Sequence, residues 1–555
     1  MDEFISWRKH RYIIISALIF LGMLFFASAF LPPEPVWITD NGSKLMIMHN
    51  YAANGSLFFE HPSPENFPCG GFHFQPLPDG RITSFHSPYL PVLTAWMGKI
   101  AGSTGILLIP MLCGAAIFAV LCRFPGGKVR IIAALAATPV LFYSLLLWEM
   151  VPAALAVTLA AWLFFRKRFI FAGAVFALGL WMREELFLLG FILLIILLCR
   201  RQWRIILHFG MGAIVPFSAL LLTNYLLYGH IAGVHGATYF INNRTGGFSL
   251  AVWGNEVLFN FCQHLIRFET LPRYSLYAAL LALVPALIAG WAPEYRKWRK
   301  FKLISGTVFA VAALVFAGAL WCRKDYLYVS AVTFGLFISV PPLLGFLLNY
   351  RALLRDKHPV TAIGAWLCTG YILAVPLLLN PNDIGLTWGA RHFIMILPLL
   401  LLLGAYGWHK SGLFAGIYGK TVFTACCAAG IVMQIYALKA LVKVTGDAEF
   451  LQQEILSLPH ETVVSDLFFL PEMTPLVPFT KTQLEISDEK QLRAALKYLH
   501  EKRIREFILI LSPDYRRIDN RCLAVLLSRY RVRMKPITYR IGNSLTFYLV
   551  ICSAP

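Results

Sequence analysis

Charged side chains are scarce in this sequence, and the features it lacks narrow the class of protein. Only 14% of the 555 residues are Asp, Glu, Lys or Arg, whereas soluble globular domains carry about a quarter. The 11 cysteines form no Cys-x-x-Cys pair, and no His-x-x-x-His or His-Glu-x-x-His spacing indicates a metal site. The net charge of +20 is spread between apolar segments rather than gathered on one domain, which argues against a nucleic-acid-binding protein.

Long apolar segments are the dominant feature, since 58% of the residues are hydrophobic. A helix needs roughly 20 apolar residues to cross the bilayer core, somewhat fewer if its ends snorkel, and backbone polar groups there must be satisfied within the helix. We therefore expect about thirteen transmembrane helices. They are placed near 12–31, 104–122, 130–148, 151–165, 169–182, 186–199, 205–227, 275–292, 303–321, 327–348, 360–379, 393–408 and 421–438.

Basic residues predict the orientation of these helices. Arg166, Lys167 and Arg168 follow the fourth expected span, Arg200 and Arg201 follow the sixth, and the loops between are poorer in Lys and Arg. Basic loops stay in the cytoplasm, so we expect a multi-pass membrane protein with a cytoplasmic N-terminus.

This orientation divides the chain into two expected domains. Residues 1–445 form the transmembrane domain, with outer loops at about 31–102 and 228–273. Residues 446–555 form a periplasmic domain, in which strand-like segments such as EFILILS alternate with helical ones such as SDEKQLRAALKYLHEKRI. Alternation of this kind is typical of a small α/β domain.

Ionisable residues gather near the outer ends of the expected spans, where each is a candidate for a functional role. They are Asp40, Glu149, Arg183, Glu184, Glu185, Asp383 and Arg391. Lys44, His86 and His235 lie in the two outer loops and are further candidates for supporting the site or binding substrate.

Five stretches resemble the GT-C superfamily of membrane glycosyltransferases, distantly like the protein mannosyltransferase and lipid A aminoarabinose transferase families. They are TDNGSK after the first span, SFHSPYLPVLTAW, YSLLLWEMVPAAL, NYLLYGHIAGVHG and WGARHFIMILPLL. Many members have two adjacent acids in the first outer loop, where this chain has Asp40 and Asn41.

The resemblance implies a protein of the bacterial inner membrane. It also implies an inverting transfer of a sugar from a polyprenyl-phosphate donor to an envelope acceptor, which is a lipid, a glycan or a protein. Asp40 is the implied base, since a carboxylate can take the acceptor's proton. A guanidinium fork suits the leaving phosphate; Arg391 is the first choice and Arg183 the second. Glu149 either binds a divalent cation or orients an arginine, and a structural Glu149–Arg183 pair is favoured.

Two other functions remain open. A transporter or flippase of a lipid-linked saccharide predicts internal repeats and polar groups at mid-membrane, but the spans are nearly free of charge there. A glycan polymerase or ligase that uses a lipid-diphosphate donor is poorly distinguished from the first function.

Overall fold

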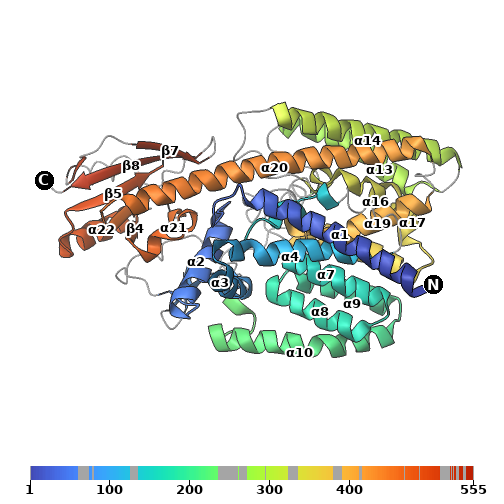
Figure 1. The fold of residues 1–555 in the computed structure, drawn as a ribbon, viewed down its shortest axis with the longest axis horizontal. Coiled ribbons are helices and arrows are strands. Elements are labelled where there is room, and N and C mark those ends of the chain that lie inside the picture. Colours follow the sequence, from blue (N-terminus) through green and yellow to red (C-terminus); the bar gives the residue numbers. More distant parts are fainter. Residues whose placement is uncertain are drawn as a thin grey trace, which may run out of the picture.

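The computed structural model describes most of the chain. The described residues are 2–59, 74–77, 81–84, 86–124, 135–234, 261, 265, 272–293, 296–322, 335–378, 391–411, 416–467, 469–486, 488–512, 526, 528, 530–532, 537–541 and 545–553. They form a bundle of helices with a β-sheet at one end, and the N-terminus lies at the opposite end (Figure 1).

The bundle is built mainly from apolar helices. They are α1 (Asp2–Ser28), α4 (Ser103–Leu121), α7 (Met150–Phe165), α8 (Phe169–Met182), α9 (Leu186–Cys199), α10 (Trp203–Tyr228), α13 (Pro272–Trp291), α14 (Arg296–Cys322), α18 (Pro359–Leu378), α19 (Leu397–Lys410) and α20 (Ile417–Ser457). Within the described residues, five helices are long and apolar enough to cross a membrane, and five apolar stretches are shorter. The chain is an integral membrane protein, and the count of thirteen spans stays a prediction.

Two of the expected spans are not continuous helices in their described parts. In place of 130–148 the structure has α6 (Val140–Tyr143) followed by turns up to Trp148. In place of 327–348 it has α15 (Leu336–Ser339), η3 (Pro341–Leu343) and α16 (Leu344–Leu348), followed by α17 (Tyr350–Leu354). Prolines lack the N–H that a helix interior requires, and they stand where both spans are interrupted: Pro139 precedes α6, and Pro341 and Pro342 form the start of η3. No proline lies in the turns at residues 144–148.

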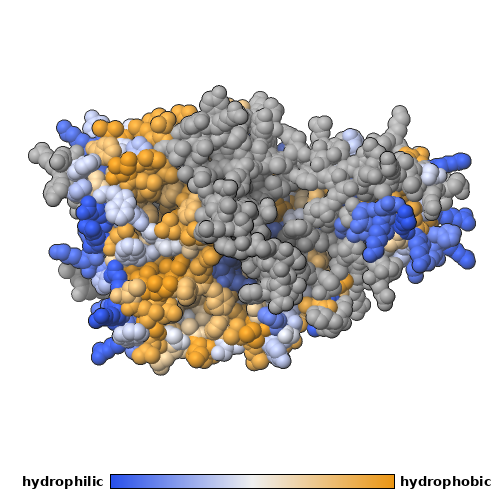
Figure 2. Space-filling view, turned by 180° about the vertical axis from the view of Figure 1, so that it is seen from behind, coloured by the Kyte–Doolittle hydropathy of each residue, from blue (hydrophilic) through white to orange (hydrophobic). Residues whose placement is uncertain are grey.

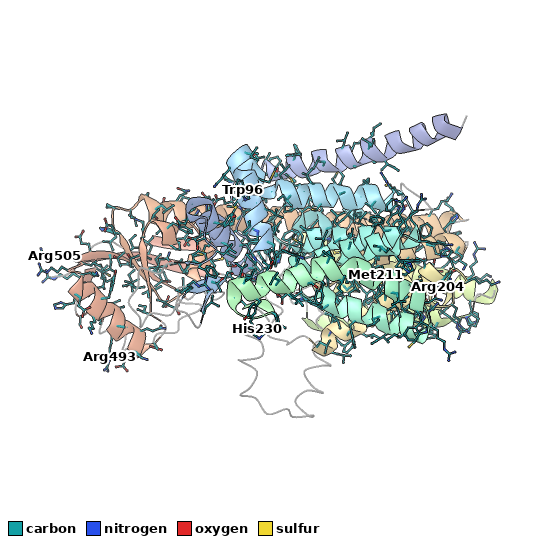
Figure 3. The ribbon with its side chains drawn as sticks, turned by 90° about the horizontal axis from the view of Figure 1, so that it is seen from below. Trp96, Arg204, Met211, His230, Arg493 and Arg505 are labelled. Atoms are coloured by element: carbon teal, nitrogen blue, oxygen red, sulfur yellow. The ribbon has the colours of Figure 1, made fainter. Side chains whose placement is uncertain are left out.

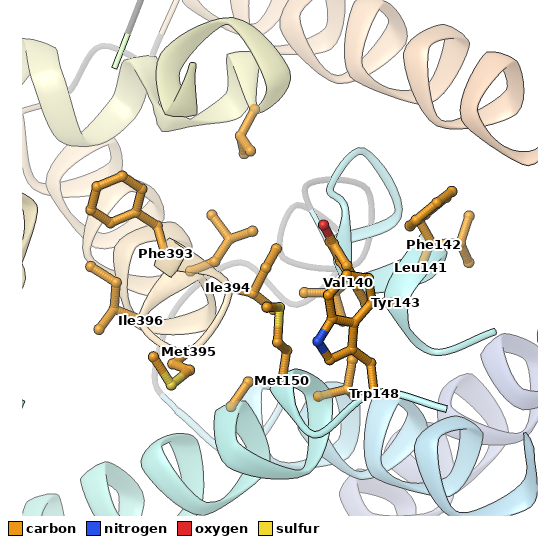
Figure 4. Packing of buried hydrophobic residues seen from close by; sticks show 14 of the residues in the cluster. Val140, Leu141, Phe142, Tyr143, Trp148, Met150, Phe393, Ile394, Met395 and Ile396 are labelled. Atoms are coloured by element: carbon orange, nitrogen blue, oxygen red, sulfur yellow. The ribbon is translucent and has the colours of Figure 1, made fainter. Parts of the chain in front are cut away.

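Protein side chains, rather than lipid, surround this irregular backbone. Val140, Tyr143 and Trp148 are fully buried, and Figure 4 shows them packed together with Met150 and Ile394 from the neighbouring elements. Non-helical backbone at membrane depth is tolerated when it is buried in this way.

The first outer loop contains one helix that the sequence did not predict, α2 (Thr39–Asn54). The other elements of this loop are β1 (Phe74–Pro76), β2 (Ile82–Ser84) and α3 (Tyr89–Ala101). Trp96 and Ile100 on α3 are exposed, as expected for a helix that lies along the membrane interface. Figure 1 shows α2 and α3 between the bundle and the sheet.

The C-terminal sheet is mixed, in agreement with the expected α/β character. The strands are β3 (Thr462–Ser465), β4 (Thr482–Glu485), β5 (Glu506–Leu511), β6 (Arg531–Val532), β7 (Ile537–Ile541) and β8 (Leu545–Ser553), with α21 (Leu470–Met473), η7 (Val477–Phe479) and α22 (Glu489–Glu501) between them. β3 runs parallel to β4 and β5, and β8 runs antiparallel to β5, β6 and β7. Asp488 caps α22 by accepting a hydrogen bond of 2.7 Å from the Gln491 N–H.

The helix α20 joins the two parts without a break. It runs through residue 445 as one helix of 41 residues, and so it crosses the expected boundary between the two domains. The division into domains at residue 445 therefore stays a prediction. The sheet part also contacts the first outer loop, because α21 packs on α2.

The molecular surface is zoned along the long axis. Figure 2 shows apolar side chains over the helical bundle and hydrophilic ones gathered at both ends. In Figure 3, Arg204 and His230 mark opposite ends of α10. Two other helices separate the candidates from the basic loops in the same way, since Glu149 and Arg166 flank α7, and Arg183 and Arg168 flank α8.

Candidate active site

Asp40 and Arg391 form an ion pair between distant parts of the chain. Asp40 lies in the first turn of α2, and Arg391 begins η5 (Arg391–Phe393), just before α19. Arg391 Nη1 donates to Asp40 Oδ2 at 3.0 Å. The Arg391 and Asp40 side chains are 12% and 14% exposed, so this pair is not fully buried.

The histidine that follows Arg391 extends this pair. Arg391 Nε donates to His392 Nε2 at 3.1 Å, and His392 Nδ1 lies 3.9 Å from Glu185 Oε1. Glu185 in turn pairs with Arg183. The Tyr371 hydroxyl on α18 donates to the His392 carbonyl at 3.2 Å, which connects η5 to a third helix.

A second ion pair lies deeper, beside the first. Lys44 Nζ is 3.0 Å from Glu149 Oε2, and these side chains are 0% and 2% exposed. Lys44 also lies over the Trp148 ring, 5.1 Å from its centroid. Neither charge of this pair is exposed to solvent.

Asn41, where many GT-C members have an acid, holds the broken segment in place. Its buried side-chain amide donates from Nδ2 to the Leu147 carbonyl at 3.2 Å. That carbonyl lies two residues before Glu149, in the turns after α6. Asn41 therefore connects the start of α2 to the backbone that presents Glu149.

Burial and neighbouring charges shift several pKa values in this region. Burial lowers the pKa of Lys44, although Glu149 and Asp40 oppose the shift. Burial acts against the charge of Arg183, but Glu185 and Glu149 outweigh it and raise the pKa of Arg183. Burial raises the pKa of Glu184 to about 7; the adjacent Glu185 adds to the shift and Arg183 opposes it.

The residues present do not suit the divalent cation that Glu149 was a candidate to bind. Glu149 is paired with Lys44 and also lies in the field of Arg183, so its surroundings are already cationic. Within the described part of the chain, no group of three or more His, Cys, Asp or Glu side chains is placed to hold a metal ion.

The structure brings most of the sequence candidates to one end of the bundle. Asp40, Lys44, Glu149, Arg183 and Arg391 interact there directly or through their charges. The expected Glu149–Arg183 pair is replaced by two pairs, because the closer partners are Lys44 for Glu149 and Glu185 for Arg183.

Other candidates lie at the edge of this cluster or cannot be placed. His86 borders a small pocket with Tyr89 and Glu184. His235 and Asp383 lie outside the described residues.

Sequence reasoning gave no site role to His392 or Tyr371. His392 stands inside the quoted WGARHF stretch, so that stretch already contained it, whereas an apolar helix supplies Tyr371 without any local signal.

Comparison with known proteins supports the fold. No family model and no curated protein matches the chain. Among solved structures, ArnT from Cupriavidus metallidurans in the apo state matches with a TM-score of 0.51 at 10% identity, over 96% of this chain and 97% of that chain. ArnT from the same organism, bound to undecaprenyl phosphate, gives a TM-score of 0.42 at 11% identity over the same shares. The chain therefore has a GT-C-like membrane fold.

Proposed function

We propose that this protein transfers one sugar from a polyprenyl-phosphate donor to an acceptor in the bacterial cell envelope, at the periplasmic face of the inner membrane. The observation that carries the proposal is the pair of Asp40 and Arg391. It sets a partly exposed carboxylate beside a partly exposed guanidinium, and the transfer requires both groups.

The reaction needs a base and a group that accepts developing negative charge. Asp40 takes the proton of the acceptor hydroxyl as its oxygen attacks the anomeric carbon. The bond from that carbon to the phosphate oxygen breaks, and the polyprenyl phosphate leaves with the electron pair. Arg391 stabilises the phosphate through charge-assisted hydrogen bonds. A single displacement of this kind inverts the anomeric carbon.

The other charged residues position these two. His392 binds Arg391 and Tyr371 holds the His392 carbonyl, so the guanidinium direction is set by a hydrogen-bonded chain. Arg183 interacts electrostatically with Asp40 and is the second phosphate-binding group that we propose. The ion pair of Lys44 and Glu149 joins α2 to the start of α7.

The choice of donor follows from the resemblance of the five quoted stretches to the GT-C superfamily, whose members use polyprenyl-phosphate-linked sugars. The orientation follows from the basic loops, which we propose to lie in the cytoplasm. The site is then periplasmic, where nucleotide sugars are absent and a lipid-linked donor is the available one.

Mass spectrometry of envelope glycans tests the function directly. Cells that lack the gene should lose one sugar from one class of lipid, glycan or protein, and the intact gene should restore it. Unchanged glycans, together with accumulation of a lipid-linked saccharide on the cytoplasmic side, would instead favour a flippase.

A further inference from the structure

A cavity of about 230 Å³ lies inside the bundle, apart from the ion pairs described above. Apolar side chains from α7, α8, α9, α18 and α19 form most of its wall, including Val157, Phe176, Leu193, Leu367 and Leu403. The described residues that line it include none of the paired groups around Asp40 and Arg391.

An apolar cavity of this size calls for an apolar occupant. Protein interiors are close-packed, and voids larger than a water molecule are few. Water does not fill a void without polar partners. In a membrane protein, an alkyl chain from the surrounding lipid is the available apolar material.

The polar lining residues lie at the end of the cavity that carries the basic loops. His358 directly precedes α18, Thr361 is in its first turn, and Tyr406 is in the last part of α19. The His358 ring lies 5.7 Å from the ring of Phe165, another lining residue. Directly after Phe165 come Arg166, Lys167 and Arg168, whose side chains are exposed.

A tryptophan beside this end marks it as a headgroup-level position. The guanidinium groups of Arg123 and Arg166 lie 5.5 and 6.0 Å from the Trp162 ring centroid. Trp is enriched at the membrane–water interface, and basic pockets between helices on the cytoplasmic side bind anionic lipid headgroups.

We propose that this cavity binds one acyl chain of an anionic phospholipid, with the lipid phosphate at Arg166–Arg168. The lipid comes from the leaflet at the basic end, which we propose to be the cytoplasmic one. The donor of the transfer reaction is a different ligand, because its phosphate belongs at Arg391. Glu149 and Arg166 lie at opposite ends of α7, whose sixteen residues span roughly 24 Å.

Two variants that fill the cavity and one matched control test this site. A Cβ added at Gly364 meets only Leu403 methyl groups at 3.8 Å, an ordinary contact, so Gly364→Leu extends into the cavity. Val157→Phe fills the cavity from α7 if the first variant folds poorly. Gly210→Leu is the control, because nothing lies within 4 Å of a Cβ there and Gly210 is not a lining residue.

The measurement is native mass spectrometry of the full chain, equilibrated with vesicles of phosphatidylglycerol and phosphatidylcholine and then extracted in detergent. We expect the unmodified chain and Gly210→Leu to retain one phosphatidylglycerol, and the filling variants to lose it. Arg166→Gln with Arg168→Gln should weaken the preference for phosphatidylglycerol by roughly fivefold for each removed charge.

Four results would overturn the proposal. One is that no lipid is retained by the unmodified chain, and another is that folded filling variants retain it fully. A third is that phosphatidylcholine is retained as well as phosphatidylglycerol, which would contradict the proposed contact between the anionic headgroup and the arginines. The fourth is displacement of the bound lipid by added polyprenyl phosphate, which would assign the cavity to the donor. None of these results depends on whether the chain transfers sugar.

Discussion

Arg391 Nη1 donates to Asp40 Oδ2 at 3.0 Å across 351 positions of the sequence. The pair places the expected base and the expected phosphate-binding group side by side before any substrate is bound. In the proposed reaction, the donor phosphate meets a guanidinium whose direction is already set by Asp40 and His392.

Replacement of Arg391 by lysine tests whether donor binding needs the two-pronged guanidinium or only a positive charge. Arg391→Lys keeps the positive charge but cannot bind two phosphate oxygens at once. A hydrogen bond to a charged group contributes about 1.5–3 kcal/mol, so donor binding should weaken by roughly 10- to 100-fold. Titration of the reconstituted protein with polyprenyl phosphate measures this, and Arg493→Lys on the exposed face of α22 is the control. Unchanged affinity would move the phosphate site to Arg183.

The buried pair of Lys44 and Glu149 predicts that removing one charge destabilises the protein more than removing both charges. Glu149→Gln leaves Lys44 buried without its ion partner and should cost about 3–5 kcal/mol. The double variant Lys44→Met with Glu149→Leu should be less destabilised than this single variant, because no buried charge remains. Chemical denaturation in detergent measures both.

An exposed ion pair provides the comparison for the buried pair. Lys497 and Glu501 are 75% and 56% exposed, so Lys497→Gln should cost about 1 kcal/mol or less. If Glu149→Gln were equally mild, Glu149 would not be a structural residue.

Glu184 predicts a dependence of stability on pH. Its pKa is raised to about 7 by burial in the folded protein, above the value of 4.5 expected when the chain is unfolded. The folded state thus holds this proton more tightly. The resulting stabilisation is complete below pH 4.5 and disappears as the pH rises through about 7. The melting temperature should fall over that range, and Glu184→Gln should make the fall shallower. An identical pH profile in both proteins would contradict the assignment.

The hydrogen bond from Asn41 to the Leu147 carbonyl predicts that an acid at position 41 would destabilise this part of the chain. Asn41→Asp replaces the donor to the Leu147 carbonyl with a group that can only accept when ionised. A buried carbonyl that loses its donor costs about 1–3 kcal/mol, and the turns before Glu149 should loosen. Hydrogen exchange of residues 144–149 measures this, with Asn54→Asp at the exposed end of α2 as the control. Equal protection in the two variants would mean that Asn41 does not hold this segment.

The sequence predicted the apolar helices and the main ionisable residues, because both leave local signals. Runs of apolar residues identify α7 to α10, and the WGARHF stretch identifies Arg391. It did not predict α2, whose Gly42 lowers helix propensity. Tertiary packing overrides that propensity, since a Cβ at Gly42 would lie 1.5 Å from the Glu472 carbonyl oxygen. The close approach of α21 requires glycine there.

The breaks in two expected spans also escaped prediction, for a related reason. Hydropathy does not distinguish a buried irregular segment from a membrane helix, and residues 140–148 are apolar in either case. Only the tertiary partners of this segment, such as the Asn41 amide on the Leu147 carbonyl, show how its backbone is satisfied. Partner choice within the charged cluster likewise depends on three-dimensional placement, which is why Glu149 pairs with Lys44 rather than with Arg183.

The measurement that tests the role of Asp40 most directly is sugar transfer by Asp40→Asn in reconstituted membranes, beside donor binding and thermal stability of the same protein. Asparagine keeps the size of the side chain but cannot take the acceptor's proton. Because general base catalysis contributes roughly 10²- to 10⁴-fold, turnover should fall by about that factor while donor binding and folding survive. Near-normal transfer by Asp40→Asn would contradict the assignment of Asp40 as the base.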